Sequence, residues 1–287
     1  MDISIQIVGS ILLAAVPAII WGYVFYRKNP GQKMLIFLTF VVGTLSVFPI
    51  LLYKALWDHL PWINAFKLAE NYKFDVIGLT NFTFLPLSVI ITFMLVGVIE
   101  EITKMLAVRA VGGEKNFQTV DDVIEFFVIA ALGFAFTENI LYFFNIWVIH
   151  GTQDLLLPFL FRSSFSTLAH LIFSGILGYY YGIAHFASPI LQEEIRKNRK
   201  HWTKKLHKLL SIRKEKLFAQ EHIIEGLLVA IGLHAIFNIL LEMNWTFMIV
   251  PFLVGGYIAL SYFFEKKQDH KNWGNLLSRM KASVLRD

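Results

Sequence analysis

The chain has 287 residues, of which 56% are hydrophobic and 16% are charged, and its mean hydropathy of +0.58 excludes an ordinary soluble domain. It has no cysteine, which excludes disulfides, thiol nucleophiles and cysteine-ligated zinc. The net charge of +5 comes from basic residues that follow alternate loops between apolar stretches. That pattern describes membrane topology and does not fit nucleic-acid binding.

Seven stretches are long and apolar enough to cross a bilayer, which takes about 20 residues. They cover residues 4–26, 34–57, 84–108, 122–149, 159–187, 221–241 and 245–264. The sequence therefore predicts an all-α, polytopic membrane bundle of about seven transmembrane helices. We expect one integral membrane domain over 1–287, because no separate polar domain remains.

Basic residues predict the orientation of these spans. The first stretch has no basic residue before it and continues to Tyr26, so we interpret it as a retained span with its N-terminus outside. The inner segments then hold 21 of the 26 lysines and arginines, as the positive-inside rule requires. The C-terminus is accordingly inside, with a basic cytoplasmic loop at 188–220 and a basic cytoplasmic tail at 265–287.

Two polar segments between the spans have expected structures of their own. The outer segment 58–83 mixes polar and aromatic residues and predicts a short interfacial helix or an ordered loop. In the loop 188–220, apolar residues stand between the basic ones. This pattern predicts an amphipathic helix that binds anionic lipid at the inner surface.

The third stretch contains three ionisable residues, Glu100, Glu101 and Lys104. Each such group near mid-bilayer costs about 2.5–3.5 kcal/mol on insertion scales, so their presence indicates a function. Glu100 lies four positions and Glu101 three positions before Lys104, and the two carboxylates do not project along the same line. We expect one to pair with the lysine and the other to be left available as a base.

The fourth stretch contains Glu138 and Asn139, with no basic residue nearby in the sequence. Glu138 therefore needs a partner from another helix or must be neutral. An interhelical hydrogen bond is the simple structural alternative to a functional role. Arg162 lies near an outer end of its span, where we interpret it as an interface residue.

Two later stretches each contain a histidine followed four residues on by a polar residue. His170 is followed by Ser174, and His234 by Asn238. Residues four apart share a helix face, so each pair presents two polar groups together. Histidine serves as a general base or a metal ligand, and the amide of Asn238 can donate to an oxyanion.

These residues, taken in order, resemble the motifs of the PrsW family of membrane proteases. The resemblance covers roughly 95–240 and consists of EExxK at Glu100 to Lys104, the segment from Phe134 to Asn139, His170, and the segment from His234 to Asn238. PrsW proteins are linked to the superfamily of CAAX prenyl endopeptidases and bacteriocin-processing enzymes. That branch commonly has arginine one position after the site of Lys104, so a prenylated substrate is not expected here.

The resemblance implies an intramembrane endopeptidase in a bacterial cell membrane that cleaves a membrane-anchored protein, such as an anti-sigma factor. It implies that Glu100 or Glu101 activates water together with His170, and that His234 and Asn238 stabilise the oxyanion. The resemblance implies supporting roles for Lys104, Glu138, Asn139 and Ser174.

The family has also been described as metal-dependent. Glu138, His170 and His234 could make a three-ligand zinc site with an open fourth position. The chain has no HExxH helix, and we prefer a mechanism without a metal cofactor. Two other functions stay open from the sequence, an ion-coupled membrane transporter and a non-catalytic membrane scaffold.

Overall fold

The computed structural model of the chain describes residues 3–28, 33–57, 59–78, 84–112, 116–196 and 213–266. Most of these residues are helical. The helices are α1 Ile3–Lys28, α2 Lys33–Leu45, α3 Phe48–Ala55, α4 Lys67–Glu70, α5 Leu87–Val111, α6 Val120–His150, α7 Leu156–Phe161, α8 Thr167–His185, α9 Ala187–Arg196, α11 Lys214–Glu242 and α12 Ile249–Lys266. Short turns of other helix types are η1 Pro61–Ile63, η2 Thr152–Asp154, η3 Arg162–Ser166 and η4 Thr246–Met248. Strand β1, Val76–Gly78, pairs antiparallel with β2, Phe84–Pro86.

Six helical segments of the described chain are long and apolar enough to cross a membrane. They are Ile3–Phe25, Lys33–Ala55, Val120–His150, Thr152–His185, Lys214–Glu242 and Thr246–Phe263. They match six of the seven expected spans and confirm the all-α, polytopic class. Helix α5 covers the remaining span. Its 25 residues make roughly 37 Å of helix, which exceeds the hydrocarbon thickness, but its charged residues set it apart from the other six.

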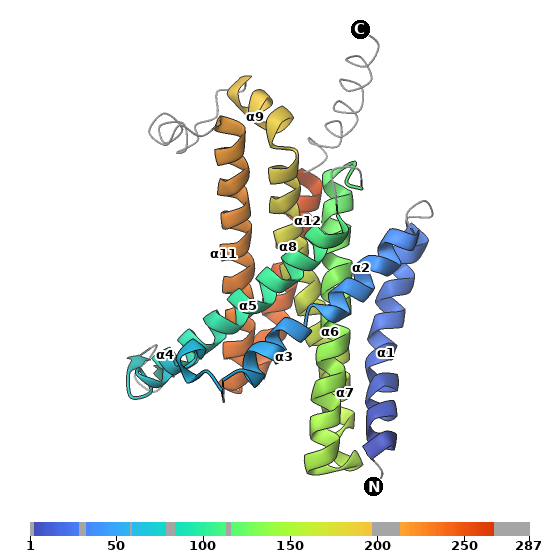
Figure 1. The fold of residues 1–287 in the computed structure, drawn as a ribbon, viewed down its shortest axis with the longest axis vertical. Helices are drawn as coiled ribbons and strands as arrows, with labels where there is room; N and C mark the ends of the chain where they lie inside the picture. The colour runs from blue at the N-terminus through green and yellow to red at the C-terminus, as the bar shows by residue number, and fades with distance from the viewer. Residues whose placement is uncertain are drawn as a thin grey trace.

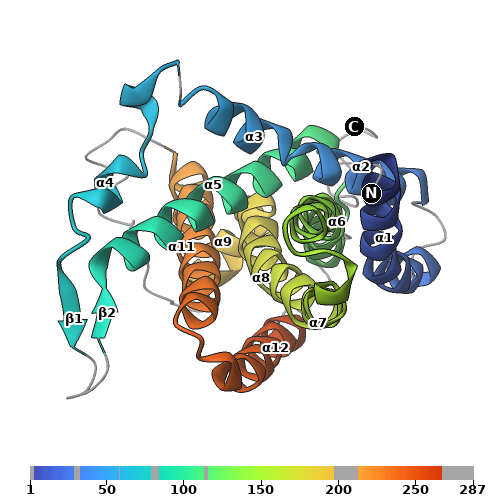
Figure 2. The same cartoon turned by 90° about the horizontal axis from the view of Figure 1, so that it is seen from below.

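Helix α8 lies at the centre of the bundle, with α6 on one side and α11 on the other (Figure 2). Helix α12 packs against α8 as well, and α1 and α2 pack against α6. In Figure 1, α5 and the α2–α3 segment run obliquely across the other long helices, and α5 packs against α11. Polar residues on α5, α6, α8 and α11 can therefore meet inside the bundle.

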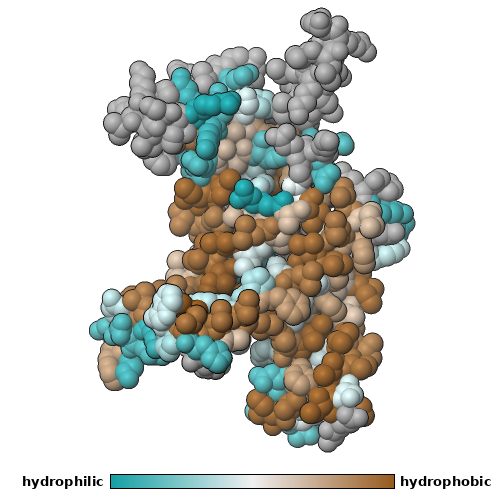
Figure 3. Space-filling view, viewed as in Figure 1, coloured by the Kyte–Doolittle hydropathy of each residue, from teal (hydrophilic) through white to brown (hydrophobic). Residues whose placement is uncertain are grey.

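The outer surface agrees with a membrane environment. Figure 3 shows hydrophobic residues over much of the face formed by α5, α6 and α11, with hydrophilic residues gathered near α9 and around α4. A broad apolar belt bounded by polar ends is the surface that a lipid bilayer requires. Which end faces the cytoplasm stays a prediction.

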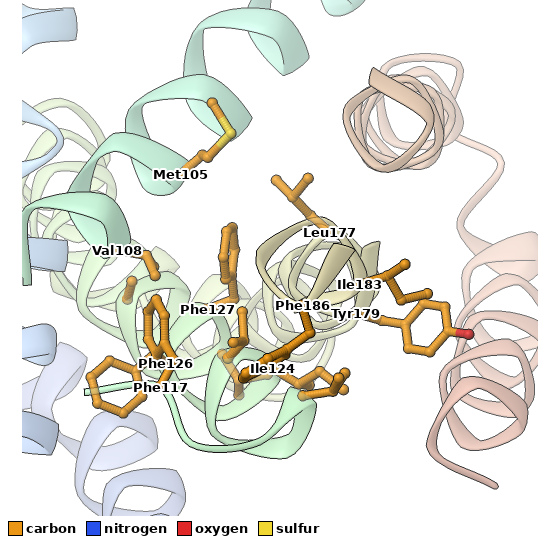
Figure 4. Packing of buried hydrophobic residues seen from close by; sticks show 14 of the residues in the cluster. Met105, Val108, Phe117, Ile124, Phe126, Phe127, Leu177, Tyr179, Ile183 and Phe186 are labelled. Atoms are coloured by element: carbon orange, nitrogen blue, oxygen red, sulfur yellow. The ribbon is translucent and has the colours of Figure 1, made fainter. Parts of the chain in front are cut away.

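A buried aromatic and aliphatic core joins α6 to α8. Helix α6 begins with a capping box, in which Thr119 Oγ1 accepts from the Asp122 backbone N–H at 3.2 Å and Asp122 Oδ2 accepts from the Thr119 N–H at 2.8 Å. In the following turns, Phe126 and Phe127 belong to the same core cluster as Leu177 of α8 (Figure 4). This packing sets the position of α6 relative to α8, and so the positions of the polar residues on both helices.

Helices α2 and α6 approach each other unusually closely at two glycines. A Cβ atom at Gly133 would overlap the backbone oxygen of Phe40, and one at Gly43 would overlap the backbone oxygen of Ala130. Small residues at such a crossing let the two backbones touch, which is a common way to pack membrane helices. Thr137, one turn after Gly133, donates across this contact to the Thr44 carbonyl at 3.1 Å.

Several boundaries differ from the expected ones. The described part of the segment 58–83 contains a short helix, α4, as one of the two expected alternatives, and also η1 and strand β1, which were not expected. The span 159–187 is interrupted by the π-helical turn η3. The span 221–241 begins earlier, at Lys214. Most of the basic amphipathic helix expected in the loop 188–220, and nearly all of the basic tail, lie outside the described residues.

Candidate active site

Glu100, Glu101 and Lys104 of α5 lie in the interior of the bundle. Glu101 and Lys104 are fully buried, whereas the Glu100 side chain is 13% exposed. Lys104 Nζ lies 2.8 Å from Glu101 Oε1 and 3.8 Å from Glu100 Oε2. The ammonium also faces the ring of Phe134 on α6, 4.5 Å from its centroid. Lys104 therefore pairs with Glu101, and Glu100 is the carboxylate left over.

Glu101 connects three helices. Its Oε1 accepts hydrogen bonds from Lys104 Nζ at 2.8 Å and from His234 Nδ1 on α11 at 2.9 Å. Its Oε2 accepts from Ser174 Oγ on α8 at 3.3 Å. A buried carboxylate needs partners of this kind to offset the loss of water. Glu101 is thus an organising group that orients a lysine, a histidine and a serine.

The bond to Glu101 determines which nitrogen of His234 bears the proton. The carboxylate is an acceptor, so Nδ1 donates, and the neutral ring has its lone pair on Nε2. That Nε2 lies 3.6 Å from Glu100 Oε2, which has no hydrogen-bond partner within the described residues. Two acceptor atoms therefore face each other. This arrangement suits a proton donor or a cation between them, and it differs from the expected role of His234 as an oxyanion donor.

His170 is held between a cation and a carboxylate. Its Nδ1 lies 2.9 Å from Lys104 Nζ and its Nε2 lies 3.0 Å from Glu138 Oε2. The ammonium can only donate, so Nδ1 accepts and Nε2–H donates to Glu138. The rings of His170 and His234 meet edge to face, with centroids 5.3 Å apart. The structure thus brings both predicted histidines into one cluster with the α5 residues.

The partner that Glu138 needs comes from the turn η3. Arg162 Nη2 lies 2.8 Å from Glu138 Oε2, and Arg162 Nε donates to Asn139 Oδ1 at 2.7 Å. The guanidinium also lies over the Tyr142 ring, 4.3 Å from its centroid. Glu138 is therefore a paired carboxylate that contacts both Arg162 and His170.

From its sequence position, Arg162 was expected at an interface, and its contact with Glu138 was not predicted. A signal was present, because an arginine within an apolar span needs an anion, and Glu138 lacked a basic neighbour in the sequence. The π-helical turn could not be anticipated, although such turns occur often at functional sites. It inserts an extra residue between Arg162 and the helix that carries His170, and the Thr167 backbone N–H accordingly donates to the Arg162 carbonyl five positions earlier. Thr167 Oγ1 donates to the same carbonyl at 2.9 Å.

The other predicted residues take different places. Asn139 is buried and donates to Thr167 Oγ1 at 3.3 Å, so its amide supports the arginine. Ser174 supports Glu101. Asn238 lies one turn after His234 on α11, is partly exposed, and makes no side-chain hydrogen bond within the described chain. Its amide is available to a bound molecule.

One group of side chains could hold a metal ion. Glu100, His170 and His234 each offer a ligand atom, and these atoms lie within 4.8 Å of one another. The expected third ligand was Glu138, but its Oε2 already contacts Arg162 and His170, so the structure groups Glu100 with the two histidines instead. The cluster contains the carboxyl groups of Glu100, Glu101 and Glu138 and the cationic side chains of Lys104 and Arg162, so carboxyl groups outnumber cations by one.

Comparison with known proteins decides the family. A model of the PrsW family of intramembrane metalloproteases matches residues 30–264, most of the chain and all of the cluster. The chain belongs to the PrsW family. It is also similar to the Protease PrsW of Clostridioides difficile (strain 630), with 26% identity over 199 residues, 67% of this chain and 71% of that protein. No solved structure matches the chain.

Membership identifies the chain as a multi-pass membrane protease and favours this activity over a transporter or a scaffold. Membership also concerns the cofactor. The PrsW family is described as one of metalloproteases, whereas from the sequence we preferred a site without a metal.

Proposed function

We propose that this PrsW protein hydrolyses a peptide bond of a membrane-anchored protein, using a water molecule whose proton is taken by Glu100. The observation that supports this proposal is the pair of acceptor atoms, Glu100 Oε2 and His234 Nε2, which lie 3.6 Å apart. Glu101 has its oxygens engaged by three partners. Glu100 is therefore the better proton acceptor of the two glutamates.

The reaction needs one proton to move twice. As the water oxygen bonds to the scissile carbonyl carbon, a proton passes from water to the Glu100 carboxylate, and the carbonyl oxygen gains a negative charge. We assign the amide of Asn238, one turn after His234, to donate to that oxygen. Glu100 then returns the proton to the amide nitrogen, the C–N bond breaks, and an acid and an amine leave.

The side chains present also fit a divalent metal ion. Glu100, His170 and His234 would hold it, since carboxylate and imidazole are common zinc ligands and three of them leave one position open. The Oε2 of Glu100, which has no hydrogen-bond partner among the residues that the structure describes, and the excess of carboxyl groups over cations in the cluster support this fit. When bound, such an ion polarises a carbonyl and lowers the pKa of water. Glu101 would orient His234, and Glu138 would orient His170, through the second ring nitrogen of each. Because His170 Nδ1 accepts from Lys104 Nζ at 2.9 Å, His170 could hold the ion only if Lys104 released that nitrogen.

The substrate class follows from where the site lies. The reacting side chains are carried by α5, α6, α8 and α11 inside the bundle, so the scissile bond must be brought there by a segment attached to the membrane. An anti-sigma factor with a membrane anchor, which the family resemblance implies, fits this requirement. Lys104 at the fourth position after Glu100 supports this class over a prenylated substrate.

The test compares cells that express the wild type, Glu100→Gln or a control variant, Glu225→Gln, which changes a carboxylate of α11 outside the cluster. Mass spectrometry of membrane-anchored fragments identifies the substrate and the cut. The purified proteins are then reconstituted with that substrate. We expect cleavage by the wild type and the control, and loss of cleavage in Glu100→Gln. Equal cleavage by all three proteins would refute the role of Glu100.

A further inference from the structure

The geometry points to Arg162 as a positioning residue for the hydrolysis, acting on His170 through Glu138. This inference rests on the proposed function, because it takes His170 to be part of the working site. The first observation is a continuous chain of short contacts. Arg162 Nη2 lies 2.8 Å from Glu138 Oε2, and the same oxygen lies 3.0 Å from His170 Nε2.

The chain of contacts determines the proton position on His170. Glu138 can accept the Nε2–H only while its carboxylate is turned toward the ring. The Glu138 side chain is 32% exposed, so without a cation beside it the carboxylate would gain by turning to water. Arg162 opposes this change. His170 thereby keeps its lone pair on Nδ1, the atom that faces Lys104.

Arg162 is itself held firmly, which a positioning residue requires. Its side chain is only 11% exposed, its Nε donates to Asn139 Oδ1 at 2.7 Å, and the Tyr142 ring lies against its guanidinium. The planar guanidinium reaches Glu138 and Asn139 with different nitrogens, which an ammonium cannot do. The turn η3 carries Arg162 immediately before α8, the helix of His170, so both ends of the contact chain lie on consecutive helical turns.

A positioning role predicts a change in turnover more than in binding. Loss of groups that orient a reacting or ligating histidine typically lowers activity about 10–100-fold. We expect Arg162→Met to lower kcat about 10–100-fold, while KM stays within about 3-fold because Arg162 does not touch the substrate. Arg162→Lys keeps the charge but not both contacts, and should recover part of the lost kcat.

The experiment is a double-mutant cycle on the full-length protein reconstituted with its cleavable membrane-anchored substrate. It compares wild type, Arg162→Met, Glu138→Gln and the double variant, with Arg109→Met as the control at an exposed arginine in the last turn of α5. Thermal unfolding of each protein in detergent reports folding. The double variant also removes both charges, so it stays informative if Arg162→Met leaves Glu138 unpaired and unstable.

Because Arg162 acts through Glu138, the double variant should have the kcat of Glu138→Gln alone. If the effects of the two substitutions on kcat multiply, the positioning role is overturned. An unchanged kcat in Arg162→Met would also overturn it, and so would a double variant that regains both the wild-type kcat and the wild-type thermal stability. These outcomes leave the proposed function intact as long as Glu100→Gln is inactive. If Glu100→Gln cleaves as well as the wild type, both the proposed function and this inference are wrong.

Discussion

Changing each of the two adjacent glutamates of α5 to glutamine should affect different properties of the protein. Glu101 is fully buried and accepts from Lys104 and His234 through the same oxygen. Glu100 is 13% exposed, and its Oε2 has no hydrogen bond to the described part of the chain. We therefore expect Glu101→Gln to lower stability and Glu100→Gln to lower activity with little loss of stability.

The size of each effect follows from these contacts. Glutamine at 101 leaves the buried ammonium of Lys104 without its close anion, and breaking a buried ion pair from one side costs about 3–5 kcal/mol of unfolding free energy. The nearest cation to Glu100 is 3.8 Å away at Lys104 Nζ, a contact with no hydrogen bond, so the change in stability should stay within about 1 kcal/mol. Removal of a general base lowers the rate by about 10²–10⁴.

The assay measures two quantities on the same purified proteins. Thermal or denaturant unfolding in detergent gives the change in stability, and cleavage of a membrane-anchored substrate in liposomes gives the rate. The variant Glu101→Gln/Lys104→Met should regain stability, because it removes the unpaired buried charge. If Glu100→Gln destabilises as much as Glu101→Gln, or if Glu101→Gln is fully stable, then the division of roles between the two carboxylates is wrong.

If the site binds a metal, a chelator should inactivate the wild type reversibly. His234→Ala should lose the bound metal, while Glu138→Gln should retain it. Elemental analysis of purified protein checks this, and active protein that contains no metal would contradict it. Asn238→Ala should lower kcat about 10²–10³-fold, the usual effect of removing one oxyanion donor, with KM nearly unchanged in steady-state kinetics. Gly133→Ala should destabilise the protein by about 1–3 kcal/mol through overpacking against α2, measured by unfolding in detergent. Reporter fusions within 188–220 should show a cytoplasmic loop, and an external loop would reverse the predicted orientation.

The spans and the local pairs could be predicted from the sequence because both depend on neighbours in the chain. Insertion into a membrane is a property of about 20 consecutive residues, so six of the seven expected spans reappear among the apolar helices. Helix geometry alone places Lys104 within reach of Glu100 and Glu101. It likewise places Ser174 and Asn238 one turn after a histidine.

The contacts between helices depended on the tertiary structure. Glu101 meets Ser174, 73 positions later, and His234, 133 positions later, and no local rule specifies how α5 crosses α8 and α11. That crossing decides which glutamate is engaged and which is available. The ion pair of Arg162 with Glu138 similarly requires η3 to turn toward α6. Spacing along one helix identifies the residues that can act, whereas the packing of four helices decides which atoms are already bonded and which can react.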